Sequence, residues 1–211
     1  MSAAAGLTAA LRVEVLRGEL APGAPLREED LAARTGHSRH TVRAALAGLV
    51  AERLAVAEAF RGVRVTSFAD ADVVALQQLR GALEVEAVRL LRVQHGTRWP
   101  DRVLAPARAA VAAMAGEPAD DWPAVAAAHA AVHAALVAAA GSPRVTEAHD
   151  RLHAEMLLLL VHVRPAYDVA RLVAEHDDYL AQVQVEGEPA VRRHLEHSTR
   201  LILAAREGDR A

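Results

Sequence analysis

The 211-residue sequence contains no cysteine, no lysine and few aromatic residues. Without cysteine the chain cannot form a disulfide, bind zinc through thiolates or use a thiol nucleophile. Aromatic residues make up only 3% of the chain, while alanine and leucine dominate, and this composition favours packed helices over an aromatic-rich β-sheet. Every basic residue is arginine, whose planar guanidinium suits bidentate contacts with carboxylate or phosphate.

Targeting and membrane signals are also missing from the sequence. We expect no apolar run to approach membrane-spanning length, since Leu157–Val161 is only a short run, and the N-terminus lacks the basic region and apolar core of a signal peptide. We therefore expect a cytoplasmic protein with no membrane partner.

The charge is unevenly distributed along the chain. The formal net charge is −3, yet residues 1–67 carry nine arginines against seven acidic residues, and the remainder carries fifteen against twenty. A mildly basic N-terminal module on an acidic body is compatible with local contacts to phosphate.

Two short helical patterns flank Gly36 and predict a helix-turn-helix. Val42, Leu46 and Leu49 recur at spacings of three and four, so the second helix has one apolar stripe. Glycine permits the sharp turn between the helices, and Ser38 is a good N-cap for the second one. Polar residues at the start of that helix would face a DNA groove.

The segment after these helices predicts a two-stranded wing. Residues 54–57 and 63–66 alternate as strands do, and Phe60-Arg61-Gly62 reads as the turn between them, with Arg61 and Gly62 at its tip. The candidate DNA-contacting residues on these elements are Arg27, Arg34, Ser38, Arg39, His40, Thr41, Arg43, Arg61 and Gly62.

Several spaced motifs in this region resemble the winged helix of GntR-family transcription regulators. They are Gly18-Glu-Leu-Ala-Pro-Gly23, Glu28-x-x-Leu-Ala32, Ser38-Arg39-x-x-Val42-Arg43-x-Ala-Leu46 and Arg61-Gly62-x-x-Val65. The resemblance covers roughly the first third of the chain and implies a DNA-binding regulator.

The rest of the chain predicts six helices and no further strand. The first five begin near Asp70 or Asp72, Trp99, Asp121, Arg144 and Tyr167. The sixth follows the turn at residues 186–189 and ends near Ala205. The expected fold class is therefore mostly α: a winged helix-turn-helix over residues 1–67 and an all-α six-helix effector bundle over residues 68–211.

Motifs in this part resemble the FCD effector domain of the FadR subfamily. They are Gln78-Leu-Arg80-x-x-Leu83-Glu84, Leu136-Val-Ala-Ala-Ala-Gly-Ser-Pro143, Glu175-His176 and Arg193-His-Leu-Glu-His197. The resemblance implies a small-molecule effector, a homodimer, and Arg80 and Glu84 as candidate effector contacts.

A histidine cluster is the candidate metal site. His129 and His133 are four apart on one predicted helix, so both side chains fall on the same face and could share a metal. The resemblance adds His176 and His194 from later helices and implies an aspartate where this chain has His129. An all-imidazole set suits a late divalent cation, with Zn²⁺ the default and Ni²⁺ possible.

Two alternatives remain open within this site. His197 could replace His194 as the last ligand, and His149 and His153 form a second pair with a four-residue spacing. Single histidines on alanine-rich helices are otherwise hydrogen-bonded or solvated residues.

The leading functional hypothesis is a dimeric, ligand-responsive repressor that binds a near-palindromic operator and responds to a small organic acid. Two alternatives are a metal-dependent enzyme built on the histidines and a DNA-binding protein whose helical domain only dimerises. The first lacks a His-Glu-x-x-His motif or a clearly placed general base.

Overall fold

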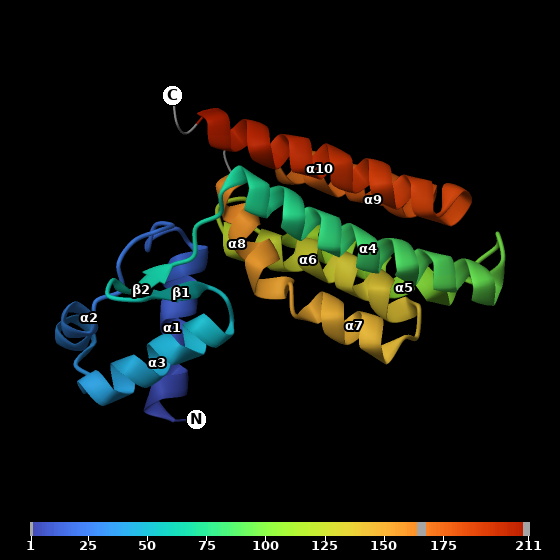
Figure 1. The fold of residues 1–211 in the computed structure, drawn as a ribbon. Coiled ribbons are helices and arrows are strands. Elements are labelled where there is room, and N and C mark those ends of the chain that lie inside the picture. The colour runs from blue at the N-terminus through green and yellow to red at the C-terminus, as the bar shows by residue number, and fades with distance from the viewer. Residues whose placement is uncertain (1, 164–167, 209–211) are drawn as a thin grey trace. The chain divides into compact units, whose positions relative to one another are not determined.

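The chain folds into two compact units, Met1–Phe68 and Ala69–Ala211, in a computed structural model that describes residues 2–163 and 168–208. The boundary predicted from the sequence lies between residues 67 and 68. Figure 1 shows both units.

The N-terminal unit contains three helices and a hairpin. They are α1 (Ala3–Leu16), α2 (Glu28–Thr35), α3 (Arg39–Ala51), β1 (Ala55–Glu58) and β2 (Gly62–Val65). Gly36 follows α2 with a φ of 70°, a left-handed conformation that favours glycine, and the Ser38 side chain accepts a hydrogen bond from the Thr41 N–H at 3.1 Å. The predicted turn and N-cap are therefore both present.

Close packing of α1 against α3 holds this unit together. The apolar stripe of α3 is buried, with Val42, Leu46 and Leu49 each at most 2% exposed. Thr8 on α1 donates a hydrogen bond to the Ala45 carbonyl at 3.2 Å. A Cβ added at Gly48 would lie 2.8 Å from Thr8 Oγ1, so the helices approach this closely because residue 48 has no side chain.

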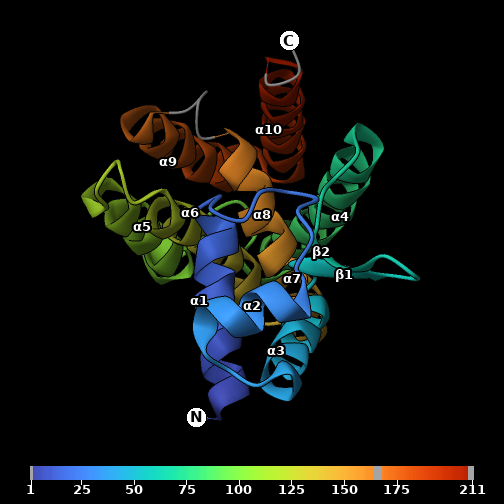
Figure 2. The same cartoon turned by 90° about the vertical axis from the view of Figure 1, so that its left-hand side faces the viewer.

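The hairpin is antiparallel, with its register running from Ala55 opposite Val65 to Glu58 opposite Gly62. Leu54 and Val65 are buried at its base, which anchors the hairpin to the helices. Figure 2 shows the β1–β2 hairpin extending away from α1, α2 and α3. The expected wing is therefore present.

The second unit is all-helical over its described residues. Its helices are α4 (Asp70–His95), α5 (Asp101–Gly116), α6 (Trp122–Ala139), α7 (Pro143–Asp150), α8 (His153–Val163), α9 (Val169–Glu186) and α10 (Glu188–Gly208). The expected fold class is confirmed, but the number of helices in this unit is seven in the described residues, not six. The predicted helix start at Tyr167 lies outside the described residues.

The extra helix arises because the predicted helix from Arg144 to Val163 is broken at Arg151–Leu152. On α7 only His149 is buried, whereas α8 has a continuous buried run from Met156 to Leu160. A break lets the two segments take different directions. No proline or glycine marks it, so packing rather than local propensity determines this boundary.

Helix α6 is the central element of this unit and contacts α4, α5, α7 and α8. It is also long and apolar enough to cross a membrane by length and composition alone, so the expectation that no segment reaches that length is wrong. Half of that stretch is buried inside the unit, and Val125, Val132 and Leu136 are fully buried in the core. Its apolarity is therefore accounted for by core packing.

Candidate DNA-binding face and candidate metal centre

The N-terminal end of α3 presents an exposed polar surface. Ser38, Arg39, His40 and Arg43 are exposed, and Thr41 is partly exposed with its hydroxyl 2.9 Å from Ser38 Oγ. Because the apolar stripe of α3 faces α1, these side chains point away from the core. The surface can therefore meet a phosphate backbone or base edges.

Two glutamates of α2 hold the arginines of α3. Arg43 donates to both carboxylate oxygens of Glu28, at 2.9 and 2.8 Å, and Arg39 lies 2.8 Å from Glu29. The hydrogen bonds from Arg43 lower the pKa of Glu28. Sequence analysis did not assign these carboxylates a contact with Arg39 or Arg43.

The other arginine candidates differ in their surroundings. Arg27 is exposed, whereas Arg34 is tied to Glu14 of α1 at 2.7 Å. Arg61 is exposed at the hairpin tip, 3.6 Å from Glu58. Gly62 has a φ of 78° and open space around a Cβ added there, so the backbone conformation, not crowding, favours glycine. Phe60, beside them, was not singled out from the sequence.

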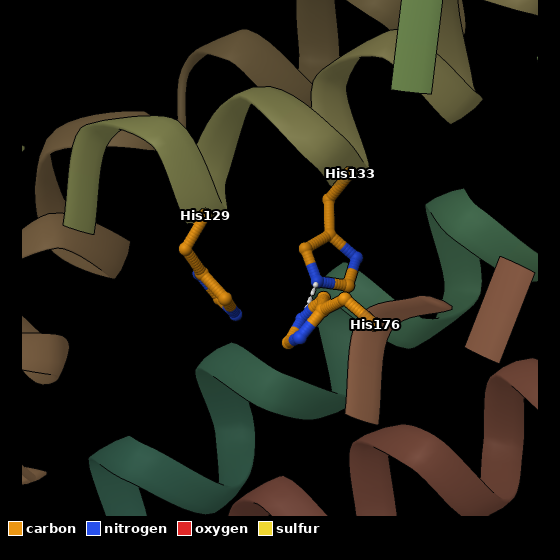
Figure 3. Close-up of side chains that lie close together, drawn as sticks. All are labelled: His129, His133 and His176. Carbon is orange, nitrogen blue, oxygen red and sulfur yellow. Dashed lines mark hydrogen bonds between the residues drawn. The ribbon is translucent and has the colours of Figure 1, made fainter. Parts of the chain in front are cut away.

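Three histidines meet inside the helical unit. His129 and His133 of α6 and His176 of α9 have one ring nitrogen each within 4.8 Å of the others, and all three are at most 5% exposed. Figure 3 shows the three rings turned toward a common space. The spacing predicted on α6 therefore brings its two histidines together, and packing against α9 adds the third.

Hydrogen bonds fix the tautomers of two of these rings. His133 Nδ1 donates to Glu84 Oε2 at 3.1 Å, and His176 Nδ1 donates to the Leu172 carbonyl at 2.7 Å. In the neutral rings both Nε2 atoms then carry lone pairs, and these atoms face each other at 3.2 Å. Two facing lone pairs repel each other unless a proton or a metal ion lies between the two nitrogen atoms.

The remaining histidine candidates fall into two groups. His194 is partly exposed, and its ring centroid lies 5.3 Å from that of His133 and 4.9 Å from that of His176, so it borders the cluster. His197 instead lies 3.7 Å from Glu175. His153 is exposed, whereas His149 is buried and its Nε2 lies 3.5 Å from Glu84 Oε1.

Glu84 on α4 connects these groups. Its side chain is fully buried, receives the Arg80 Nε–H at 2.6 Å and accepts the Tyr179 hydroxyl at 3.1 Å in addition to His133. Burial alone would raise the pKa of Glu84, but Arg80 and the hydrogen-bonded His133 hold it well below its usual value. Arg80 and Glu84 therefore form a charge-neutral pair behind the cluster.

The cluster is neutral at physiological pH. Burial lowers the pKa of His133 to about 3 and that of His176 to about 4. Burial and the neighbouring histidines also lower the pKa of His129 and of His194. Neutral imidazoles are the form that binds metal.

The donor set fits a divalent metal ion. Two nitrogen ligands about 2.0–2.1 Å from one tetrahedral zinc ion lie about 3.3 Å apart, close to the His133–His176 separation of 3.2 Å. His129 Nδ1 is buried with no hydrogen-bond partner among the described residues. The contacts of His133 to Glu84 and of His176 to Leu172 are of the kind that orient histidine ligands.

Each of the two units matches a known protein family. Residues 3–65 match the family model described as bacterial regulatory proteins, gntR family, and residues 75–207 match that of the FCD domain. The chain is 27% identical to the HTH-type transcriptional repressor GlaR of Escherichia coli over 212 residues, covering 94% of this chain and 95% of that protein.

Two further relatives are similar over different lengths. The uncharacterized HTH-type transcriptional regulator BphR of Paraburkholderia xenovorans is 40% identical over 94 residues, 44% of this chain and 38% of that protein. The crystal structure of a putative transcriptional regulator GntR from Rhodococcus sp. RHA1 superposes with a TM-score of 0.74 at 25% identity, over 97% and 99% of the two chains. The chain therefore belongs to the GntR family of bacterial regulatory proteins, in the FadR-like group with an FCD domain, and is a DNA-binding transcription regulator rather than an enzyme.

Proposed function

We propose that this chain is a cytoplasmic, ligand-responsive repressor that binds a near-palindromic operator as a homodimer. Two full-length or partial relatives carry the word repressor in their names, GlaR and a probable D-xylose utilization operon repressor of Paenarthrobacter nicotinovorans. A two-fold symmetric dimer would place two copies of α3 on two half-sites of one operator. The residues proposed to contact DNA are Arg27, Ser38, Arg39, His40, Thr41, Arg43, Arg61 and Gly62, with Arg34 a weaker candidate because Glu14 holds it.

The observation that carries the effector half of this proposal is the pair of facing Nε2 atoms of His133 and His176. These two residues and His129 would hold a Zn²⁺ or Ni²⁺ ion, with His194 at the border of the site. Such an ion, when bound, supplies a Lewis-acidic anchor for an oxygen ligand.

The charge of the site supports an organic acid as the effector. Arg80 and Glu84 cancel each other, and the histidines are neutral, so these residues together leave the charge of a divalent cation without an offset. An effector carboxylate would supply the missing negative charge. Gln77 contacts Arg80 at 3.4 Å and also lines a groove of about 740 Å³ between α4 and α10, so a small ligand in this groove would lie beside the Gln77–Arg80 contact.

The effector would act by binding one conformation of the repressor more tightly than another. A ligand with equal affinity for both conformations shifts nothing, so the operator-bound and effector-bound forms must differ at this site. We expect effector binding to weaken operator binding, and operator binding to weaken effector binding by the same factor.

The test begins with the untagged full-length chain. Elemental analysis after incubation with Zn²⁺ or Ni²⁺ at neutral pH would be compared with the His133→Ala/His176→Ala double variant and with His153→Ala, a matched control whose side chain is exposed. Metal retained by the native chain and by the control, and lost from the double variant, is the expected result. Equal metal in all three would show that these histidines do not form a metal centre.

A second arm tests the regulator. Duplexes selected from a random library would be used to measure affinity and stoichiometry, with and without Zn²⁺ and a panel of small mono- and dicarboxylates. We expect two chains per near-palindromic duplex and weaker binding with one class of acid. If no acid or metal changes the affinity, the helical domain only dimerises the protein.

His129 stands where the family resemblance implies an aspartate, and a substitution at this position tests the charge argument directly. His129→Asp supplies one negative charge inside the site, so metal should still bind while the affinity for an anionic effector falls. An unchanged effector affinity would contradict the charge argument without affecting DNA binding.

A further inference from the structure

The tip of the β1–β2 hairpin carries an aromatic side chain, Phe60, that is fully exposed to solvent. Phe60 has a relative exposure of 108%, as exposed as in an extended peptide. No other large apolar residue among those described is exposed by more than 74%. The chain contains only two phenylalanines, and the other, Phe68, is buried at 9% exposure.

The backbone at this position would favour a different residue. The Arg61 N–H donates to the Glu58 carbonyl at 3.1 Å, which closes a β-turn with Phe60 as its third residue and a φ of 65°. A left-handed conformation at that position favours glycine or asparagine, because a bulky side chain crowds the backbone. Phenylalanine therefore works against the local turn preference and gains no packing within the protein in return.

The surroundings of Phe60 indicate what covers it. Arg61 is the next residue and its side chain is 74% exposed, so the tip combines a cation with an apolar ring. Nucleic acid has phosphates that can pair with the Arg61 guanidinium and base faces that can stack on the Phe60 ring. Apolar side chains of this kind insert between base steps in a minor groove and kink the duplex. The hairpin projects from the unit that carries α3 (Figure 2). With α3 in one groove of the operator, the hairpin would reach the adjacent groove.

We propose that Phe60 is an apolar wedge that enters the minor groove of the operator at the wing tip and unstacks one base step. This inference rests on the proposed operator binding. Arg61 would hold the tip at the flanking phosphates, and Phe60 would make the operator preference depend on how easily one step unstacks. Flexible pyrimidine–purine steps would then be favoured at a position that no hydrogen bond reads.

The test uses the full-length chain and a duplex recovered by its own selection from a random library. Phe60→Asn removes the ring and installs a residue that the turn favours, so the hairpin should keep its thermal midpoint. Val56→Ala, an exposed apolar residue on β1 away from the tip, is the matched control. Arg61→Ala removes a charge at the same tip.

We expect Phe60→Asn to weaken operator binding by roughly 5- to 150-fold, the range for losing one aromatic contact with a base. The slope of log K against log salt concentration should stay unchanged, because no charge is removed. Arg61→Ala should instead reduce that slope by about 1. A 2-aminopurine placed at the proposed step should brighten with the native chain and with Val56→Ala, but not with Phe60→Asn.

Equal affinity and equal 2-aminopurine signal for Phe60→Asn and the native chain would overturn the wedge while leaving operator binding intact. A changed oligomeric state of Phe60→Asn without DNA, at unchanged operator affinity, would also overturn it, since the ring would then contact protein. A native chain that enriches no duplex would refute the operator proposal itself.

Discussion

Acidification is expected to destabilise the helical unit of the metal-free protein. Burial lowers the pKa of His133 to about 3 and that of His176 to about 4, whereas both would have a pKa of 6.5 in the unfolded chain. Between pH 6.5 and 4 the unfolded state therefore binds more protons than the folded state. The free energy of unfolding therefore has its full value above pH 6.5 and decreases as the pH falls below that value.

The size of the effect at pH 5 follows from the unfolded pKa. Each of these two histidines remains neutral in the folded protein at pH 5, which lies about 1.5 pH units below the pKa of 6.5 in the unfolded chain. Protonation of each histidine in the unfolded chain therefore lowers the free energy of unfolding by about 2 kcal/mol relative to neutral pH. The two together give about 4 kcal/mol. A single proton shared across the 3.2 Å between their Nε2 atoms would reduce this to about 2 kcal/mol. Either value is a large part of a typical stability of about 5–15 kcal/mol.

Intrinsic fluorescence can report this unit selectively. The only two tryptophans in the chain, Trp99 and Trp122, are both buried in the helical unit. Urea unfolding would be followed at pH 7.5 and 5 after chelation, with the His133→Gln/His176→Gln double variant and with His95→Gln, a partly exposed histidine, as a control. The double variant should lose most of the pH dependence, and the control should keep it.

Equal free energies of unfolding for the metal-free native chain at pH 7.5 and 5 would refute this reasoning, because neutral buried histidines cannot avoid the proton linkage. Added Zn²⁺ should stabilise the native chain at pH 7.5 and lose this effect by pH 5, since protons and metal compete for the same nitrogens. Stabilisation by Zn²⁺ that is equal at both pH values would mean that it binds elsewhere.

Three further perturbations test other parts of the structure. Arg43→Ala should weaken specific operator binding by about 1–3 kcal/mol in fluorescence anisotropy while dimerisation is kept, and unchanged affinity across a salt series would remove it from the interface. Gly48→Ala should destabilise the N-terminal unit by about 1–2 kcal/mol in circular dichroism, because its Cβ meets Thr8, and an unchanged melt would contradict this. Glu84→Gln should cost about 3–5 kcal/mol in urea unfolding because it leaves Arg80 buried without a counter-charge, and Arg80→Met/Glu84→Gln should recover part of that loss.

The DNA-binding unit could be predicted in detail because its signals are local. Gly36 and Ser38 mark a turn and an N-cap within a few residues of the helices they limit, and the apolar stripe of α3 follows one helical period. The paired positions of β1 and β2 are likewise close in sequence. The carboxylate contacts of Arg39 and Arg43 could not be predicted, because they join two helices whose relative orientation no local pattern specifies.

The metal candidates were only partly predictable for the same reason. The spacing of His129 and His133 is a property of one helix, but Glu84 lies 49 residues before His133 and 95 before Tyr179 in sequence. Its position at the centre of the polar cluster depends on how α4, α6 and α9 pack. Periodicity also cannot choose between His194 and His197, three residues apart on α10; packing places the first beside the cluster and the second beside Glu175.

The break between α7 and α8 shows how one unmarked boundary changes the chemistry of a site. In the continuous helix predicted from the sequence, His149 and His153 would share a face at a spacing of four residues and could act as a second metal-binding pair. The break at residues 151–152 separates them, so that His149 is 8% exposed and reaches Glu84 while His153 is exposed. His149 Nε2 is buried without a hydrogen bond among the described residues, although it lies 3.5 Å from the carboxylate. The break therefore adds one histidine to the polar cluster and removes the competing pair.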